Sequence, residues 1–329
     1  IREILLDKQA VCSYGAKTEL SMEGGRIIST EPFYAYIKIA EGCSNNCTYC
    51  AIPSIRGKYR SRRMEDIVKE ARWLAENGVT ELVVVAQDTT RYGEDIYGKS
   101  MLPELLTALC EIDGFKWIRT LYCYPERITD ELLDVIAKED KLVKYLDMPI
   151  QHCNKTILKR MNRHGDRETL TALIKKIREK IPNVTLRTTL ITGFPGETEE
   201  QFEELCEFVK EIRFERLGCF AYSPEEGTPA EKFEDQVPLK DRERRAEIIM
   251  EEQMIISDSL NEAALDSEVE VVCEGFDRYA ECYYGRSQAD APEIDGKIFF
   301  LSEDKVRVGE YVKVKIDDTM DYDLIGSKM

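Results

Sequence analysis

Apolar runs alternate with helix-like stretches from about residue 34 to residue 221 of the chain. The run at 81–86 (ELVVVA) is continuously apolar, as in a strand that is buried on both faces. Six runs are predicted to be strands, at 36–39, 81–86, 117–121, 145–148, 185–191 and 217–221. Stretches with helical spacing lie between them or follow them, at 64–77, 102–111, 130–137, 156–161, 168–180 and 199–211. This order predicts a parallel α/β barrel or open sheet, with functional residues after the carboxyl ends of the strands.

The pattern changes after a long amphipathic helix that is predicted at 241–265. Short strand-like runs follow, separated by glycines, at 268–273, 279–284, 297–301 and 311–316. Short strands with glycine turns are typical of a small all-β barrel. We therefore divide the chain into a short leading segment (1–33), an α/β domain (34–261) and a β-barrel domain (262–329).

The chain is acidic, with 46 Lys and Arg against 63 Asp and Glu and a net charge of −17. This balance disfavours nucleic acid as the main electrostatic partner and suits a basic protein better. No apolar run is long enough to predict a membrane span. The 11 cysteines do not form the dense framework of a small secreted domain, so a reducing cytoplasm is the expected compartment.

Three cysteines, Cys43, Cys47 and Cys50, lie together directly after the first predicted strand, in a C-x3-C-x2-C spacing. Thiolates are ligands for iron–sulfur clusters and for zinc. A closed structural zinc site needs four ligands, and no second cysteine pair follows downstream to complete such a set. Three thiolates on a four-iron cluster would leave one iron open to a ligand. Structural zinc and three unrelated buried thiols are the alternatives.

This motif, with Tyr49 before its last cysteine, resembles the signature of the radical S-adenosylmethionine (SAM) enzymes. The resemblance implies a partial (β/α)6 barrel, a [4Fe–4S] cluster on the three cysteines, and SAM bound to the open iron. In that family, one electron from the cluster splits SAM and gives a 5′-deoxyadenosyl radical that abstracts hydrogen from carbon.

Further segments resemble the methylthiotransferases of that superfamily: 41–63 (EGCSNNCTYCAIPSIRGKYRSRR), 145–163, 193–197 (GFPGE) and 223–230 (SPEEGTPA). The segments 86–90 (AQDTT) and 285–296 (GRSQADAPEIDG) are similar to the RimO branch. That resemblance implies insertion of a methylthio group at the β-carbon of an aspartate in the small-subunit ribosomal protein S-twelve. The alternatives are a tRNA adenosine methylthiotransferase of the MiaB type and a non-catalytic iron–sulfur protein that docks on ribosomal components.

The small barrel resembles a TRAM domain, a module that usually helps to bind RNA. Residues 262–329 contain 17 acidic and 8 basic side chains, a balance that should repel phosphates and attract a basic ribosomal protein. Local basic patches are the alternative. The implied partners are therefore the ribosomal protein and an electron donor such as flavodoxin or ferredoxin, without a membrane and with nucleic acid not primary.

Other candidate site residues follow predicted strands. Gln87, Asp88 and Thr89 end the second strand; we assign a catalytic role to Asp88 and SAM contacts to Gln87 and Thr89, with strand-end hydrogen bonding as the alternative. SAM contacts are also assigned to Tyr49, to Arg187, which could equally form an ion pair in the barrel, and to the turn Gly193-Phe194-Pro195, which could equally only open a helix.

The basic run Arg56, Lys58, Arg60, Arg62 and Arg63 could meet a carboxylate or be a solvated face. His152 and His164 are interpreted as structural.

The resemblance has one departure. Methylthiotransferases carry three further cysteines in an N-terminal domain for a second cluster, and here only Cys12 precedes Cys43. We interpret 1–33 as the remnant of that domain and expect one cluster in this chain and a second in the full-length protein.

Overall fold

The computed structural model describes residues 22–329, so Cys12 and most of the predicted segment 1–33 lie outside the described residues. Two parallel three-stranded sheets form the first domain, in the orders β1-β4-β5 and β6-β7-β8. Their strands are β1 (Tyr34–Lys38), β4 (Glu81–Val85), β5 (Trp117–Thr120), β6 (Tyr145–Asp147), β7 (Thr185–Thr192) and β8 (Arg216–Ala221). A parallel bridge between Ile118 and Leu142 links the two sheets. The six expected parallel strands are therefore confirmed.

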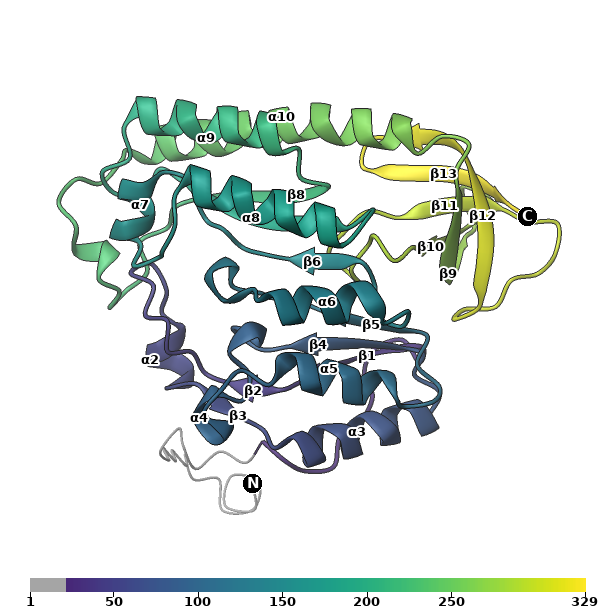
Figure 1. The fold of residues 1–329 in the computed structure, drawn as a ribbon. Coiled ribbons are helices and arrows are strands. Elements are labelled where there is room, and N and C mark those ends of the chain that lie inside the picture. Colours follow the sequence, from purple (N-terminus) through teal and green to yellow (C-terminus); the bar gives the residue numbers. More distant parts are fainter. Residues whose placement is uncertain (1–21) are drawn as a thin grey trace, which may run out of the picture.

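Helices follow the strands in the expected order, and Figure 1 shows α3, α5, α6 and α8 stacked along one side of the strands. The helices are α2 (Ile52–Arg56), α3 (Met64–Glu76), α4 (Glu94–Tyr97), α5 (Leu102–Cys110), α6 (Asp130–Lys138), α7 (Lys155–Arg160), α8 (Arg167–Lys180), α9 (Glu199–Ile212) and α10 (Leu239–Ala263). Short 3-10 turns lie at η2 (Thr89–Arg91), η3 (Pro125–Arg127) and η4 (Ala230–Lys232). The short helices α2 and α4 and the ribbon β2 (Ala40–Glu41)–β3 (Arg60–Ser61) were not predicted.

Local sequence explains where several helices begin. Thr129 and Asn154 accept hydrogen bonds from the first turns of α6 and α7. Asp166 with Thr169, and Thr198 with Gln201, form reciprocal capping boxes at α8 and α9. These side chains satisfy backbone N–H groups that have no partner inside the helix, which fixes the start of each helix.

Strand alternation separates two cores. Side chains such as Ile37, Leu82 and Leu146 point into the main core under the helices. Their neighbours Tyr34, Val83, Trp117 and Tyr145 belong to a second cluster on the inner face of the half barrel, together with Val272 and Ala291 from the C-terminal domain. Since successive side chains of a strand point to opposite faces, this alternation defines which residues face the lumen.

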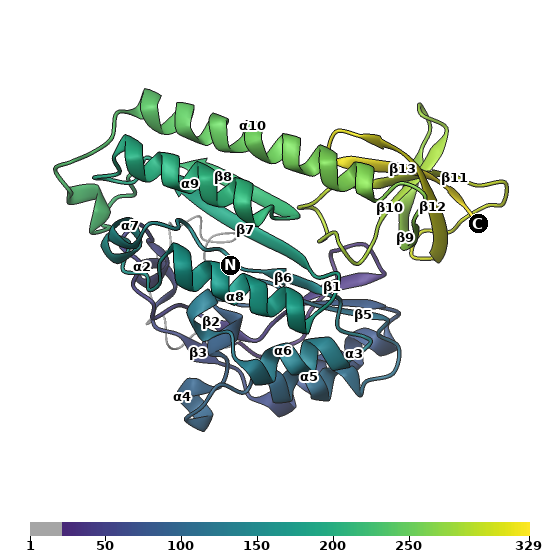
Figure 2. The same cartoon turned by 45° about the horizontal axis from the view of Figure 1, so that its top comes forward.

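The C-terminal domain is a closed five-stranded barrel in the order β10-β11-β13-β12-β9. Its strands are β9 (Glu268–Asp277), β10 (Cys282–Arg286), β11 (Ile298–Leu301), β12 (Tyr311–Met320) and β13 (Asp323–Lys328). The all-β barrel was expected, whereas β13 was not among the predicted strands. Helix α10 runs from the first domain to this barrel (Figure 2), where Asn261 Nδ2 donates to the carbonyl oxygen of Asp321 at 3.0 Å.

The barrel packs against the amino ends of the strands of the first domain. The rings of Trp117 and Tyr311 meet edge to face at 4.8 Å. A buried ion-pair network lies beside them: Glu81 contacts Arg119 at 3.1 Å and Arg286 at 2.5 Å. The loop after β10 extends from this contact toward the lumen, where the hydroxyl of Tyr145 donates to Asp295 at 2.6 Å. The C-terminal barrel thus closes the amino end of the half barrel.

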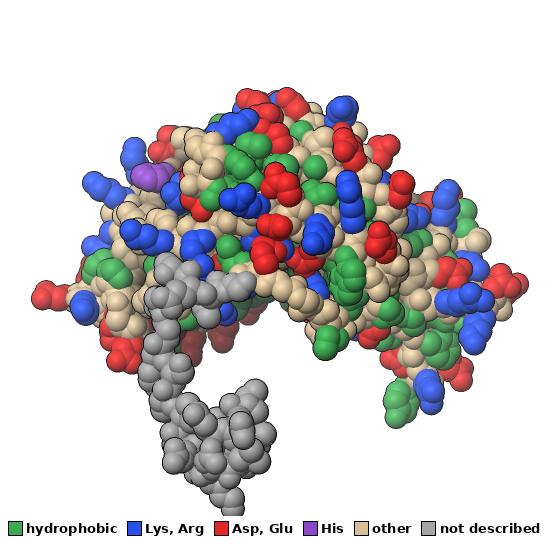
Figure 3. All heavy atoms as spheres, turned by 90° about the horizontal axis from the view of Figure 1, so that it is seen from below, with side chains coloured by type: hydrophobic (Ala, Val, Ile, Leu, Met, Phe, Trp, Pro, Cys, Tyr) green, Lys and Arg blue, Asp and Glu red, His purple; other side chains and the backbone are tan. Residues whose placement is uncertain are grey.

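On the face drawn in Figure 3, acidic and basic side chains are interspersed among hydrophobic ones, without one sign covering that face. Within the part of the chain that the structure describes, no helix is both long and apolar enough to cross a bilayer.

Candidate active site

The cysteine loop begins where β2 ends, at the carboxyl end of β1. Gly42 has φ +76°, and a Cβ there would lie 2.4 Å from the carbonyl oxygen of Lys58, so only glycine fits this close approach. Directly after it, the backbone N–H of Cys43 donates to the carbonyl of Gly57 at 3.1 Å. The start of the loop is therefore fixed against the segment that follows α2.

Two other segments hold the middle of the loop. The N–H and hydroxyl of Thr48 donate to the carbonyls of Met161 and Arg160 at the end of α7, at 3.1 and 2.8 Å. The carbonyl of Thr48 accepts from the N–H of Ala230 at 3.0 Å. The amide of Asn162 donates to the carbonyls of Asn45 and Asn46 at 3.1 and 3.0 Å. These contacts order the loop mainly through its backbone and do not involve the cysteine side chains.

The three thiols form a coherent donor set. Cys43 and Cys47 are buried and Cys50 is half-buried. Burial raises the pKa of Cys43 and of Cys50, and the nearby Cys47 adds to both shifts. Thiols this close together and withdrawn from water are suited to bind metal as thiolates, because metal ligation supplies the positive charge that they lack. The hydroxyl of Tyr124 lies 3.1 Å from Cys47 Sγ as a further hydrogen-bond partner.

Residues 22–329 contain no group of three or more His, Cys, Asp or Glu side chains arranged around a single metal ion. In a [4Fe–4S] cluster each cysteine ligates a different iron, and three cysteines on one loop can supply three such ligands.

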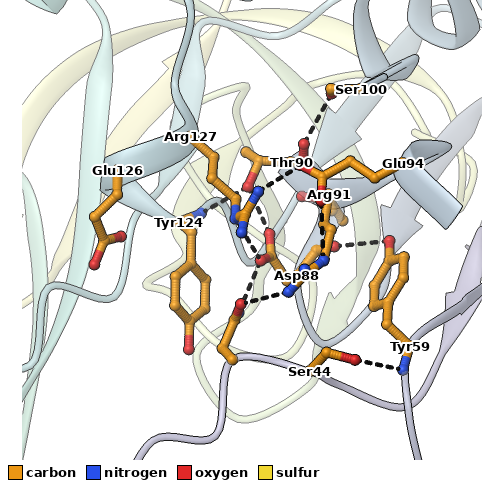
Figure 4. A network of polar contacts seen from close by, with 12 residues as sticks. Ser44, Tyr59, Asp88, Thr90, Arg91, Glu94, Ser100, Tyr124, Glu126 and Arg127 are labelled. Carbon is orange, nitrogen blue, oxygen red and sulfur yellow. Dashed lines mark hydrogen bonds and ion pairs between the residues drawn. The ribbon is translucent and has the colours of Figure 1, made fainter. Parts of the chain in front are cut away.

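Asp88 is fully buried and sits at the centre of a polar network that reaches the cysteine loop (Figure 4). Its carboxylate accepts from Asn45 Nδ2 at 2.8 Å and from the hydroxyl of Thr90 at 2.5 Å. Arg127 Nε lies 3.6 Å away, and Arg91 Nη1 donates to Asn45 Oδ1 at 3.0 Å. The backbone carbonyl of Asp88 accepts from the hydroxyl of Tyr59 at 2.9 Å. This geometry suits a residue that positions the loop between Cys43 and Cys47.

The residues on either side of Asp88 differ in environment. Thr89 is fully buried, and its hydroxyl and N–H donate to the carbonyls of Leu121 and Tyr122 at 2.9 and 3.1 Å. These hydrogen bonds join the segments that follow β4 and β5. Gln87 instead lines a hollow of about 680 Å³ together with Tyr36, Lys38, Leu121, Tyr122 and Ile294, among others. Gln87 Oε1 is buried and has no hydrogen-bond partner among the described residues.

A hollow of this size lies within the range of small-molecule sites. An unpaired buried acceptor is costly unless a ligand or water donates to it. Gln87 lines the hollow, but its Oε1 is itself withdrawn from solvent, so a bound molecule could donate to this oxygen only after the amide turns toward the hollow.

Arg187 faces the lumen from β7 and is paired with carboxylates. Its Nη1 lies 2.9 Å from Asp147 Oδ1, and its Nε lies 3.7 Å from Asp295 of the C-terminal domain. The second oxygen of Asp147 accepts from the N–H of Tyr122 at 2.9 Å. Of the two interpretations of Arg187 made from the sequence, this arrangement matches the ion pair.

The turn Gly193-Phe194-Pro195 is buried under α10 and the segment that follows β8. The N–H of Gly193 donates to both carboxylate oxygens of Glu197 at 3.0 Å, and a Cβ on Gly193 would lie 2.4 Å from Arg242 Cγ. The ring of Phe194 packs against that of Tyr222 at 5.3 Å. Tyr49 packs against the same small cluster. The structure thus places Tyr49 and Phe194 together, away from the hollow that Gln87 lines.

The residues of the basic run after the cysteine loop differ in their exposure to solvent. Arg62 is buried and pairs with Glu70 at 2.7 Å, whereas Arg56, Lys58 and Arg63 are exposed. His152 is buried, 3.5 Å from the Glu197 carboxylate.

Sequence reasoning missed Asn45, Tyr124 and Lys38. The position of Asn45 between two cysteines was the available signal for it, and Tyr124 and Lys38 follow or end strands, where functional side chains gather.

Comparison with known proteins agrees with these features. Residues 37–209 match the model of the radical SAM superfamily, and residues 267–328 match that of the TRAM domain. Ribosomal protein uS12 methylthiotransferase RimO of Clostridium tetani is 51% identical over 320 residues, covering 97% of this chain and 71% of the relative. The proteins of the same name from Clostridioides difficile and Caldanaerobacter subterraneus are 53% and 49% identical, covering 92% and 99% of this chain and 68% and 74% of the relatives.

Among solved structures, the radical SAM enzyme coproporphyrinogen III oxidase (HemN) from Escherichia coli aligns with a TM-score of 0.49 at 22% identity. The alignment covers 69% of this chain and 52% of that one.

Proposed function

Since this chain belongs to the radical SAM superfamily, and within it to the RimO family of methylthiotransferases, we propose that it inserts a methylthio group at the β-carbon of an aspartate in ribosomal protein uS12. One observation supports this most strongly. Asn45, in the loop of Cys43, Cys47 and Cys50, donates a hydrogen bond to Asp88, which follows the end of β4. Gln87, the residue before Asp88, lines the hollow. A cluster on that loop would adjoin a space large enough for SAM and a substrate side chain.

The residues of this chain would have distinct roles. Cys43, Cys47 and Cys50 would each ligate one iron, and the fourth iron would bind SAM. Asp88 and Asn45 would keep the loop in place, and Gln87 Oε1 would accept a hydrogen bond from SAM. A reduced cluster with SAM supplies the hydrogen-abstracting radical. The lumen would contribute enclosure, because the C-terminal domain closes its amino end.

The reaction would exchange one hydrogen atom of the substrate for SCH3. The C–H bond at the β-carbon breaks, and its hydrogen leaves in 5′-deoxyadenosine. The C–S bond would form between the resulting carbon radical and sulfide-level sulfur that carries the methyl group of a second SAM, and the one electron released by this step would pass to an oxidised one-electron carrier. The electron that splits SAM would come from a low-potential donor protein of the flavodoxin or ferredoxin class. We also propose that 34–261 and 262–329 are separate domains.

Mass spectrometry would test the proposal. The reconstituted protein is incubated without oxygen with SAM, sulfide, reductant and either uS12 or tRNA. We expect uS12 to gain about 46 Da, the mass of SCH3 less one hydrogen, at one aspartate. Unmodified uS12 alongside a methylthiolated tRNA would overturn the proposal in favour of the tRNA enzyme. Absence of 5′-deoxyadenosine, with both substrates unchanged, would favour the docking protein.

The acidity of the C-terminal domain weighs against the tRNA alternative. With 17 acidic and 8 basic side chains in residues 262–329, phosphate binding lacks the cations that it needs. A basic ribosomal protein gains from the same surface.

A further inference from the structure

The inner face of the half barrel carries several cations, and their partners differ. Arg119 is fully buried beside Glu81 at 3.1 Å. Arg187 pairs with Asp147, and Arg216 pairs with Asp290 of the C-terminal domain at 2.6 Å. In each of these pairs the carboxylate is almost entirely buried, so separating the charges would leave a buried ion without a partner. Such a separation costs several kcal/mol, so these arginines are poorly suited to release their partners for a ligand.

Lys38 occupies a different position on the same face. Alternation along β1 directs Ala35, Ile37 and Ile39 into the main core, while Tyr36 and Lys38 line the hollow of about 680 Å³. Lys38 is the last residue of its strand, five positions before Cys43. Its side chain is 50% exposed and donates to Glu41 Oε2 at 2.8 Å. Lys38 therefore lies at the carboxyl end of β1 and beside the hollow, a few residues before the cysteine loop along the chain.

The partner of Lys38 can be exchanged at little cost. The ammonium group of Lys38 is half exposed to water, whereas Glu41 is buried, so the exchange depends on the partners that Glu41 keeps. Glu41 would stay compensated without the lysine, because its Oε1 accepts from the N–H of Gly42 at 3.1 Å and lies 3.9 Å from Arg56 Nε. An incoming carboxylate could thus take the Lys38 ammonium group from Glu41 without leaving a buried charge unpaired.

We propose that Lys38 binds the side-chain carboxylate of the substrate aspartate in this hollow; the assignment rests on the function proposed above. The hollow is lined by the apolar side chains of Val85, Leu121 and Ile294 and by the carboxylate of Glu293, so a second carboxylate entering there requires a cationic partner. The reacting β-carbon is bonded to that carboxylate carbon. Holding the carboxylate therefore fixes the β-carbon one bond away, as hydrogen abstraction demands. Aspartate is selected over asparagine because only the charged group can replace Glu41.

The test measures the affinity of reconstituted, SAM-bound protein for two uS12 peptides, one with the target aspartate and one with asparagine in its place. Wild type should prefer the aspartate peptide. In Lys38→Met that peptide should bind about ten- to a hundredfold more weakly, while the asparagine peptide binds as before. Lys38→Arg should keep most of the preference. Lys69→Met, an exposed lysine on α3, is the matched control and should change neither affinity.

SAM affinity and iron content are measured on the same samples. If Lys38→Met keeps the aspartate preference, the proposal is wrong. If it weakens SAM instead of the peptide, the carboxylate bound by Lys38 is that of SAM, and the assignment to the substrate is overturned. These outcomes differ from failure of the proposed function, in which wild type itself gives no mass gain on uS12.

Discussion

Arg286 of the C-terminal barrel places its Nη2 2.5 Å from Oε2 of Glu81, the first residue of β4, and both side chains are almost fully buried. Glu81 also pairs with Arg119, and Arg286 also pairs with Glu274 at 2.6 Å. Four charges are thus interleaved across the contact between the domains. Each domain contributes one carboxylate and one arginine, and the contact between Glu81 and Arg286 joins these two pairs across the domain boundary.

Replacing Glu81 should therefore destabilise the protein strongly. In Glu81→Gln, Arg119 and Arg286 lose their shared carboxylate where all three side chains are buried, and we expect the free energy of unfolding to fall by about 3–5 kcal/mol. Chemical denaturation under anaerobic conditions measures this change. Lys116→Met is the control, because it breaks an exposed pair with Glu270 across the same contact and should cost about 1 kcal/mol or less. Equal losses in the two variants would contradict this account of the contact.

Substitution of Asp88 can distinguish a role in positioning the cysteine loop from a catalytic role. Asp88→Ala leaves Asn45 and Thr90 without their acceptor and should loosen the cysteine loop. We expect fewer than about four irons per chain after reconstitution. Asn45→Ala removes the other side of the same contact and should show the same deficit. A full iron complement combined with lost SAM cleavage would instead support the catalytic role that the sequence suggested.

Gln87 should show opposite effects on stability and on binding. Its Oε1 is buried without a partner, so Gln87→Leu should raise the free energy of unfolding of the ligand-free protein, by about 1 kcal/mol. The same change should weaken SAM binding, because the acceptor is lost. Thermal unfolding and equilibrium binding of SAM measure the two effects. A variant that is less stable and binds SAM normally would argue against a ligand role for Gln87.

The pair of Arg187 and Asp147 predicts a pH dependence. Burial raises the pKa of the Asp147 carboxyl, and Arg187 opposes that rise. A carboxyl with a raised pKa in the folded state contributes stability at low pH that is lost as the pH rises through that pKa. Arg187→Met should raise the pKa further. The destabilisation relative to wild type should then be small near pH 4 and grow to about 3 kcal/mol by pH 7.

Denaturation of both proteins across this pH range measures the difference. The control is an exposed pair: hydrogen bonds from Lys176 and Lys180 lower the pKa of Asp130, so any penalty of Lys176→Met should be small and should also fade as the pH falls. A penalty for Arg187→Met that does not vary with pH would show that Asp147 stays ionised throughout.

The outcome for individual elements shows what local pattern could predict. The continuous apolar run of β4 and the capping residues of α8 and α9 made those elements predictable from the sequence. Strand β13 was missed because it and the end of β12 bury few side chains, and Asp317, Asp318, Asp321 and Asp323 give this hairpin the polarity of a loop. Closure of the barrel, where β13 pairs with β11 and β12, decides that this segment is a strand.

The sequence by itself determined the order of strands and helices and the set of three thiols on one loop, since periodicity and short spacings are local properties of the chain. Only the tertiary structure decided which charged and polar groups are paired within the fold and which remain available to bind a ligand. Asp88 meets Asn45 across 43 positions, and Arg286 meets Glu81 across 205. Such pairs form where folding removes water and a charge needs a partner, and no pattern along the chain records which partner that is.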